Sequence, residues 1–247
     1  MNKIEIEINA DVGEGIENES LILPLLSSCS IACGGHTGDE SSMRKAVQLA
    51  LKNKVKIGAH PSYPDRVNFG RLSMVMSSEN LKASIRSQLQ GFVNILNKEN
   101  AILHHIKPHG ALYNDMASNL ELATLFLEAI EPYKNKVKLY VPYASVSAKL
   151  ALRNNFNIAY EVFLDRNYNA DLTLVSRKQP NALLTDPQEV LDHLLQLVQK
   201  KQVLVTNGVT VHIKADTYCI HSDTSSALQI LTYLHSELPN HNIVIKK

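Results

Sequence analysis

Short apolar runs of strand length alternate with amphipathic helical segments along this chain of 247 residues. The strand-like runs are residues 4–8, 28–33, 55–59, 102–106, 137–141, 158–163 and 217–220. Apolar residues at helical spacing lie between them, for example in 43–51 and 81–96. Because parallel strands need long crossover connections, usually helices, this order predicts a parallel α/β sheet. About seven strands can close into a barrel or form an open doubly wound sheet, and periodicity alone does not choose between them.

Local signals mark the ends of several expected elements. Asp39 is expected to cap the helix that follows it, and Ser118 with Glu121 matches a capping box. Pro187 stands where the first residue of a helix is expected. Residues 203–211 contain an Asn-Gly pair between two apolar runs, which predicts a small hairpin.

Ionisable side chains follow directly after most of the expected strands. They are Asp11, His36, His60, His109, Asp165 with Arg166, and His221 with Asp223. In a parallel α/β barrel the carboxyl ends of the strands meet at one mouth, where catalytic groups lie. The recurrence of such groups at separate strand ends favours an active site, and the acid Asp11 and the histidines of this set are the candidate catalytic residues.

Residues 58–71, GAHPSYPDRVNFGR, form a conformationally specified loop after the third of these strands. Proline restricts φ and glycine permits positive φ, so these residues constrain the path of the chain between His60 and Arg71. A stiff, polar loop after a buried strand costs stability unless it holds something. We interpret this loop as one wall of an active site.

Several further polar side chains near the strand ends have two interpretations each. Four arginines can bind a carboxylate or phosphate, or can instead pair with Asp65 and Asp165: Arg66, Arg71, Arg166 and Arg177. Lys107 is either an anchor for an anion or a solvated strand end. Three tyrosines can hydrogen-bond a ligand or cover the site: Tyr63, Tyr113 and Tyr168.

An aspartate with several histidines also raises a metal hypothesis, with Asp11, His36 and His60 as the candidate ligands. A metal-dependent hydrolase would use a carboxylate and two imidazoles and would leave one position for a water that the cation acidifies. One ligand per strand suits a barrel but matches no compact ligand motif. The alternative without a metal uses Asp11 as a general base and a histidine as an acid or oxyanion stabiliser.

Composition limits the partners and the compartment. The net charge of +1, without a basic stripe, argues against a nucleic-acid partner. No apolar run approaches the about 20 residues that a membrane helix needs, and the first residues read as a strand rather than a signal peptide. Three cysteines in apolar runs are expected to be buried thiols, which favours a cytoplasmic protein. Since no linker or change of composition is visible, we expect residues 1–247 to form a single domain.

The loops at the strand ends resemble those of the LamB/YcsF family, the family of the 5-oxoprolinase A subunit. The resemblance rests on NADVGEG (9–15), ACGGHTGDE (32–40), GAHPSYPDRVNFGR (58–71), KPHGALYN (107–114), EVFLDRNY (161–168) and IHSDT (220–224). These motifs span essentially the whole chain in order. The sequence departs from the usual family pattern at Ala10, at Gly35, where a phenylalanine is usual, and at Thr37, Leu72 and Ser222.

The resemblance implies an irregular seven-stranded parallel β/α barrel related to polysaccharide deacetylases. It implies ATP-dependent opening of 5-oxo-L-proline (pyroglutamate) to L-glutamate, with Mg²⁺ accompanying ATP and with separate B and C subunits. The expected catalytic residues are then Asp11, His36, His60, His109 and His221. The expected substrate- or phosphate-binding residues are Arg66, Arg71, Lys107, Tyr113, Asp165, Arg166 and Asp223. Two other classes stay open, a metal-dependent amide or carbohydrate deacetylase and a non-catalytic substrate-binding subunit.

Overall fold

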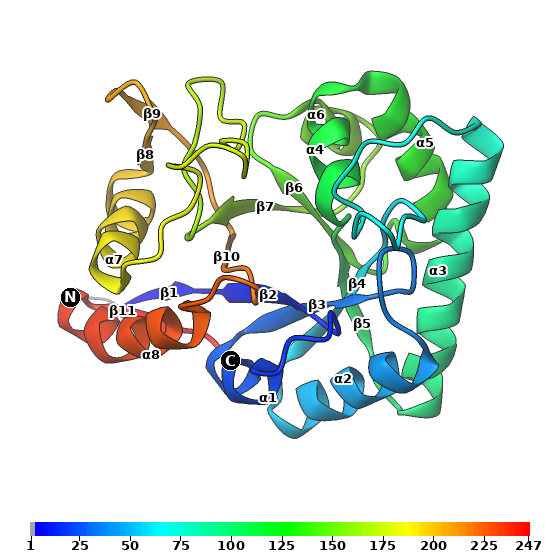
Figure 1. Cartoon of the computed structure of the whole chain (residues 1–247), viewed down its shortest axis with the longest axis horizontal. Coiled ribbons are helices and arrows are strands. Elements are labelled where there is room, and N and C mark those ends of the chain that lie inside the picture. Colours follow the sequence, from blue (N-terminus) through cyan, green and yellow to red (C-terminus); the bar gives the residue numbers. More distant parts are fainter. Residues whose placement is uncertain (1–2) are drawn as a thin grey trace.

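Seven parallel strands close into a barrel in the computed structural model, which describes residues 3–247 (Figure 1). Around the barrel they are β10 (Thr217–Cys219), β2 (Ile8–Val12), β3 (Ser28–Ala32), β4 (Lys56–His60), β5 (Leu103–Ile106), β6 (Lys138–Pro142) and β7 (Ile158–Phe163). Strand β7 pairs with β10, which closes the circle. The expected barrel is therefore confirmed, and the open doubly wound sheet is excluded.

Helices cover the outside of the barrel, with α3 running along its right side in Figure 1. The helices are α1 (Glu19–Ile22), α2 (Glu40–Lys52), α3 (Ser78–Lys98), α4 (Gly110–Ser118), α5 (Leu120–Ile130), α6 (Val146–Arg153), α7 (Pro187–Leu195) and α8 (Ala227–Glu237). Short 3₁₀ turns are η1 (Leu23–Leu25), η2 (Glu131–Tyr133) and η4 (Leu238–His241), and η3 (Gln196–Lys200) is a π turn. Within residues 3–247, no helix is both long and apolar enough to span a bilayer.

The helix caps follow the sequence signals with one exception. Asp39 caps α2, since its Oδ1 accepts a hydrogen bond from the Ser42 amide and the Ser42 hydroxyl accepts one from the Asp39 amide. The expected capping box at Ser118 is wrong, because α4 continues through Ser118. The cap of α5 is Asn119, whose Oδ1 accepts from the Leu122 amide at 3.0 Å.

Two small sheets lie outside the barrel. The expected first strand is split, because β1 (Ile4–Ile6) pairs in parallel with β11 (Ile243–Ile245) while β2 alone enters the barrel. The expected hairpin is confirmed as the antiparallel pair β8 (Gln202–Leu204) and β9 (Thr210–His212). The β1–β11 sheet brings the two ends of the described chain together.

The main core lies between the barrel strands and the helices. Helix α2 shows how the sequence creates it, because Met43, Ala46, Val47 and Ala50 recur at helical spacing and are buried. The three cysteines are also buried and free, as the sequence predicts. Inside the barrel, the ring of His105 stacks on Tyr140 with 4.0 Å between centroids.

Candidate active site

Three expected site histidines and an acid come together at the carboxyl ends of neighbouring strands. Asp11 is in β2, His60 ends β4, and His36 lies in the loop after β3. His109 follows β5 and stands at the N-cap of α4. All four side chains are buried. The predicted gathering of these groups on one mouth is therefore present in the fold.

The three imidazole rings pack directly against one another. His36 and His109 are stacked, with centroids 3.7 Å apart and ring planes 3° from parallel. His60 stands edge-on to His109, with centroids 4.9 Å apart, and Phe69 covers His36 edge-on at 5.1 Å. This packing sets the directions of the ring nitrogens in the free protein.

Backbone carbonyl groups orient two of these rings. Nδ1 of His60 donates to the carbonyl of Lys107 at 2.7 Å, and Nε2 of His109 donates to the carbonyl of Phe69 at 2.9 Å. The remaining nitrogens, Nε2 of His60 and Nδ1 of His109, face each other at 3.0 Å. Both rings therefore present their second nitrogen to the interior of the site.

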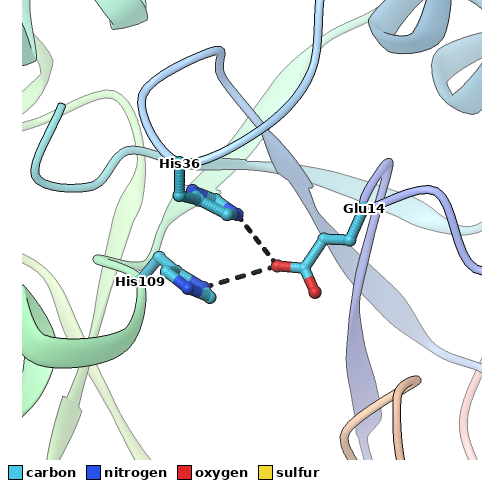
Figure 2. A group of neighbouring side chains, drawn as sticks. All are labelled: Glu14, His36 and His109. Carbon is cyan, nitrogen blue, oxygen red and sulfur yellow. Dashed lines mark hydrogen bonds and ion pairs between the residues drawn. The ribbon is translucent and has the colours of Figure 1, made fainter. Parts of the chain in front are cut away.

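Glu14 completes this cluster, although the sequence did not single it out as a site residue. Figure 2 shows one of its carboxylate oxygens pointing between the rings of His36 and His109. Oε1 lies 3.0 Å from Nε2 of His36 and 3.4 Å from Nδ1 of His109. Burial raises the pKa of Glu14 to about 7. The signal that could have identified it is its place between Gly13 and Gly15, directly after a strand.

Burial also controls the ionisation of the histidines. It lowers the pKa of His36 to about 3 and that of His109 well below its usual value, because neither ring has enough polar surroundings to solvate an imidazolium. Both rings are therefore neutral at pH 7 in the free protein. A neutral imidazole can accept a proton or bind a cation through its bare nitrogen.

Lys107 lies inside the barrel below this cluster. Its Nζ is 2.9 Å from Oδ1 of Asp11, 2.9 Å from Oε1 of Glu161 and 3.2 Å from Sγ of Cys219. Although burial alone would lower it, the carboxylates of Asp11 and Glu161 hold the pKa of Lys107 well above its usual value. The alternative of a solvated strand end is wrong. Burial likewise opposes ionisation of Asp11, but His60 and Lys107 hold its pKa well below the usual value.

His221 belongs to a second group on the same side of the barrel. Its Nδ1 lies 2.9 Å from Oδ1 of Asp165, and its ring stacks on Phe163 with centroids 5.1 Å apart. The Thr224 hydroxyl donates to Oδ2 of Asp165 at 2.6 Å. Burial opposes ionisation of Asp165, but His221 holds the pKa of this carboxyl below its usual value. Asp165 thus orients His221 rather than reaching a ligand directly.

The four candidate arginines divide into two kinds. Arg71 and Arg177 both pair with Asp223, with Nη1 of Arg177 at 3.3 Å from Oδ2. The expected alternative pairs with Asp65 and Asp165 are not formed by these two side chains. Arg71 and Arg177 are partly exposed and remain able to meet an anion.

Arg66 and Arg166 instead support the backbone. Arg66 donates to the carbonyls of Gly34 and Gly38, at 3.2 and 2.5 Å, and so fixes the loop that carries His36. Arg166 is buried and donates to the carbonyls of Val175 and Ala182. Its guanidinium stabilises the segment after β7. Because its hydrogen bonds go to the backbone, the structure does not favour the predicted contact of Arg166 with a phosphate.

The three candidate tyrosines mainly contact other parts of the protein. Tyr63 donates to Oδ2 of Asp115 at 3.0 Å, and the Tyr168 hydroxyl accepts from the amide of Phe163 at 2.7 Å. Tyr113 is buried edge-on against Phe163, with 5.8 Å between centroids. Burial, with Glu161 nearby, raises the pKa of Tyr113 well above its usual value, so its hydroxyl stays protonated.

Loop 58–71 closes over the histidines, as the interpretation of a site wall requires. Gly70 has a φ of +62°, and a Cβ there would lie 2.9 Å from Cβ of His36 and 3.0 Å from Cδ2 of His109. Only a residue without a side chain fits at this approach. Its carbonyl accepts from the Ala111 amide at 2.9 Å, which ties the loop to the start of α4.

Gly35, where the family usually has phenylalanine, is equally crowded. A Cβ would lie 2.4 Å from Oγ of Ser62 and 2.5 Å from Oε1 of Gln88. The Gln88 amide binds both the N–H and the carbonyl of Ser62, at 3.0 and 2.8 Å. In this chain Gln88 therefore fills the space beside Gly35 and holds loop 58–71 from behind.

Two surface hollows lie away from the histidines. One of about 690 Å³ lies outside the barrel, among residues of α3, α5 and α6. Another of about 260 Å³ lies at the opposite end of the barrel, beside Glu7 and Lys138. We place the candidate site at the histidines nonetheless, because ionisable groups converge there from separate strand ends.

The residues best placed to hold a metal ion differ from the expected set. Ligand atoms of Glu14, His36 and His109 all lie within 4.8 Å of one another. Asp11, the expected carboxylate ligand, instead contacts Lys107 and lies 3.4 Å from Nε2 of His60. The expected trio of Asp11, His36 and His60 therefore shares only His36 with the trio that the fold assembles.

Comparisons with known proteins agree with this fold and identify a family. The model of the LamB/YcsF family matches residues 6–247. The A subunit of 5-oxoprolinase from Haemophilus influenzae (strain PittEE) is 40% identical over 241 residues, which cover 98% of each chain. The crystal structure of a lactam utilization protein from Thermus thermophilus superposes with a TM-score of 0.90 at 31% identity, over 98% of this chain and 99% of that one.

A more distant likeness shows the fold alone. The family 4 carbohydrate esterase from Streptomyces lividans has a TM-score of 0.51 at 8% identity, over 100% of this chain and 93% of that one. The family match, in contrast, covers nearly the whole chain. This chain belongs to the LamB/YcsF family.

Proposed function

We propose that this chain is the A subunit of a cytoplasmic 5-oxoprolinase, which opens 5-oxo-L-proline to L-glutamate with hydrolysis of ATP. The observation that carries the proposal is the 40% identity, over 98% of both chains, to a protein named as the A subunit of 5-oxoprolinase. The word subunit in that name supports the expectation of partner subunits, which we propose to be B and C.

The chemistry explains why ATP is needed. A five-membered lactam is an unreactive amide, and its opening is unfavourable unless it is coupled to another reaction. Transfer of the γ-phosphoryl group of ATP to the amide oxygen would give an activated imidate and ADP. Water then adds to the activated carbon, and the ring nitrogen takes up a proton as the C–N bond breaks, which leaves an acyl phosphate. A second water hydrolyses this acyl phosphate to the carboxylate of glutamate and phosphate. The sum is 5-oxoproline, ATP and two waters giving glutamate, ADP and phosphate.

The clustered acids and imidazoles supply the groups that this sequence of steps needs. Nε2 of His60 lies 3.4 Å from Oδ2 of Asp11, so this pair suits proton removal from water. His221, held by Asp165, suits proton delivery to the ring nitrogen. Lys107 keeps Asp11 ionised, and we propose that role for it in place of direct phosphate binding.

The exposed arginines suit the anionic parts of the reactants. Arg71 and Arg177 meet at Asp223, where a carboxylate or phosphate can take over part of their hydrogen bonding. Magnesium is expected to accompany ATP, as in other phosphoryl transfers.

The test is a coupled assay of 5-oxoproline with ATP, scored for both glutamate and phosphate. It is run with this chain alone and with its B and C subunits. Stoichiometric glutamate and phosphate, lost on replacing His60 by asparagine, would support the proposal. Binding of 5-oxoproline without turnover in the full assembly would show a non-catalytic role instead.

A metal-dependent amide or carbohydrate deacetylase is the second candidate. The donor group of Glu14, His36 and His109 favours it, since a carboxylate and two imidazoles suit a hydrolytic metal site. Equal turnover of an acetylated substrate with and without ATP, abolished by a chelator, would support this candidate. Strict dependence of glutamate formation on ATP would reject it.

A further inference from the structure

Three donor atoms at the barrel mouth have the spacing of ligands around one small cation (Figure 2). Oε1 of Glu14 lies 3.0 Å from Nε2 of His36 and 3.4 Å from Nδ1 of His109. A tetrahedral zinc ion with bonds of about 2.0–2.2 Å places its ligand atoms about 3.3–3.6 Å apart. The observed separations are therefore close to those around such an ion.

The hydrogen bonds of two histidines fix which ring nitrogens face the site. Because carbonyl oxygens only accept, the Lys107 carbonyl requires a proton of His60 on Nδ1, and the Phe69 carbonyl requires that of His109 on Nε2. In the neutral ring of His109, Nδ1 is then bare and can bind a cation. Nε2 of His60 lies 3.0 Å from this nitrogen.

Two carboxylates lie beside these histidine nitrogens and favour the binding of a cation there. Oε1 of Glu14 lies 3.4 Å from Nδ1 of His109, and Oδ2 of Asp11 lies 3.4 Å from Nε2 of His60. Lys107 is committed to Asp11 and Glu161. In the part of the chain that the structure describes, the ion-pair partners of Glu14 are histidines and include no lysine or arginine. Its charge is therefore matched there by a proton or by an added cation.

The surroundings of His109 are those of a metal ligand. Its second nitrogen donates to the Phe69 carbonyl, which fixes the tautomer and leaves Nδ1 to bind. His36 stacks on His109 with ring planes 3° from parallel, and each lone pair lies in its ring plane, so the ring of His36 must turn for both nitrogens to meet one ion. Nδ1 of His36 has no hydrogen-bond partner among the described residues, so this turn breaks no bond at that atom. Imidazole nitrogens favour zinc and similar ions over magnesium or calcium, which prefer oxygen ligands.

We propose that Glu14 Oε1, His36 Nε2 and His109 Nδ1 bind one divalent transition-metal ion of the zinc type. Three protein ligands leave at least one coordination position for water or a substrate oxygen. His60 and Asp11 border the site and can hydrogen-bond to such a ligand. The proposal goes beyond the proposed function, since it requires neither 5-oxoproline nor ATP.

The test measures metal binding without substrate, ATP or partner subunits. The full chain is stripped with a chelator, and Zn²⁺ is titrated in competition with a chromophoric chelator. Co²⁺ is titrated separately, because its visible absorption reports nitrogen and oxygen ligands in a low-coordinate site. We expect the unaltered chain to bind one ion. We expect the dissociation constant to be at least about 100-fold larger in the variants Glu14→Gln, His36→Gln and His109→Gln. The reason is that mutation of a residue that only hydrogen-bonds to a metal ligand already lowers metal affinity about 10–100-fold.

His221→Gln is the matched control. This histidine lies on the same side of the barrel but is bound to Asp165, so its loss should leave metal affinity within about threefold of the unaltered chain. Circular dichroism establishes that each variant is folded. As a second measurement, added Zn²⁺ should raise the Tm of the unaltered chain and leave that of the near-isosteric Glu14→Gln unchanged.

Two results would overturn the proposal. One is the lack of stoichiometric binding by the folded, unaltered chain, which would mean that hydrogen bonds alone hold Glu14, His36 and His109 together. The other is unchanged binding in the His36→Gln and His109→Gln variants. Neither result bears on the 5-oxoprolinase assay, so the two proposals fail separately.

Discussion

The ammonium nitrogen of Lys107 lies 2.9 Å from Oδ1 of Asp11 and joins the end of β5 to β2 across the inside of the barrel. The same nitrogen lies 2.9 Å from Oε1 of Glu161, in β7. One buried cation thus holds two carboxylates from separate strands. Because desolvated charges are costly when unpaired, this arrangement makes the barrel interior depend on Lys107.

We expect Lys107→Met to lower the free energy of unfolding by roughly 3–5 kcal/mol, as breaking a buried ion pair generally does. The methionine leaves Asp11 and Glu161 without a cation in a buried site. Urea unfolding at pH 7 measures the change. Lys98→Met is the control, since Lys98 pairs with Glu40 on the exposed surface and its loss should cost far less. Recovery of stability on adding Glu161→Gln would support the mechanism, and an unchanged free energy in Lys107→Met would contradict it.

The barrel could be predicted because each strand is an apolar run and the crossover segments have helical spacing. The convergence of Asp11, His36, His60 and His109 followed from the geometry of parallel strands. The ring contacts among them could not be predicted, since they depend on loop paths such as that of Gly70 over His36.

The ion pairs were the least predictable part of the site. Arg66 and Asp65 are adjacent in sequence, but the structure directs Arg66 to the Gly34 and Gly38 carbonyls. Arg71 pairs with Asp223, which is 152 residues away along the chain. Glu14 was missed because a single acid in a glycine loop has no periodicity, and only the folded loops bring it to the histidines.

A close approach inside the barrel predicts a steric effect at Gly58. A Cβ on Gly58 would lie 2.1 Å from Nε2 of His105, which is hydrogen-bonded to Oγ of Ser30 at 3.1 Å. We expect Gly58→Ala to lower the free energy of unfolding by about 1–3 kcal/mol, the usual cost of overpacking. Gly91→Ala is the control, because Gly91 lies in α3 with open space around it and should gain about 0.5–1 kcal/mol from helix propensity. Equal effects of the two substitutions in thermal unfolding would refute the steric argument.

His193 predicts a dependence of stability on pH. Burial lowers its pKa to about 4, although its hydrogen bond to the Phe163 carbonyl and the charge of Asp165 oppose the shift. The unfolded chain binds this proton near pH 6.5, so the stabilising effect is complete above about pH 6.5 and is lost as the pH falls toward 4. The loss is at most about 1.4 kcal/mol per pH unit.

His193→Gln removes the titrating group and keeps a donor for the Phe163 carbonyl. The unfolding free energy of the unaltered chain should therefore fall more steeply than that of His193→Gln between about pH 6.5 and pH 4. Urea titrations at several pH values measure both curves, and the common effects of other groups cancel in their difference. Parallel curves would mean that His193 does not become protonated on unfolding in this range.

The shared contact of Arg71 and Arg177 with Asp223 predicts a kinetic effect on the proposed reaction. If an anionic group of 5-oxoproline or ATP binds these guanidinium groups, Arg71→Met removes a charge-assisted hydrogen bond worth about 1.5–3 kcal/mol. We expect the KM of one reactant to rise roughly 10- to 100-fold while kcat changes little, because the contact exists before and during the reaction. The coupled assay with the partner subunits separates the two constants. Arg86→Met is the control, because Arg86 lies beside the hollow outside the barrel, and this variant should leave KM and kcat unchanged. A loss of kcat without a change in KM in Arg71→Met would instead place Arg71 in the chemical step.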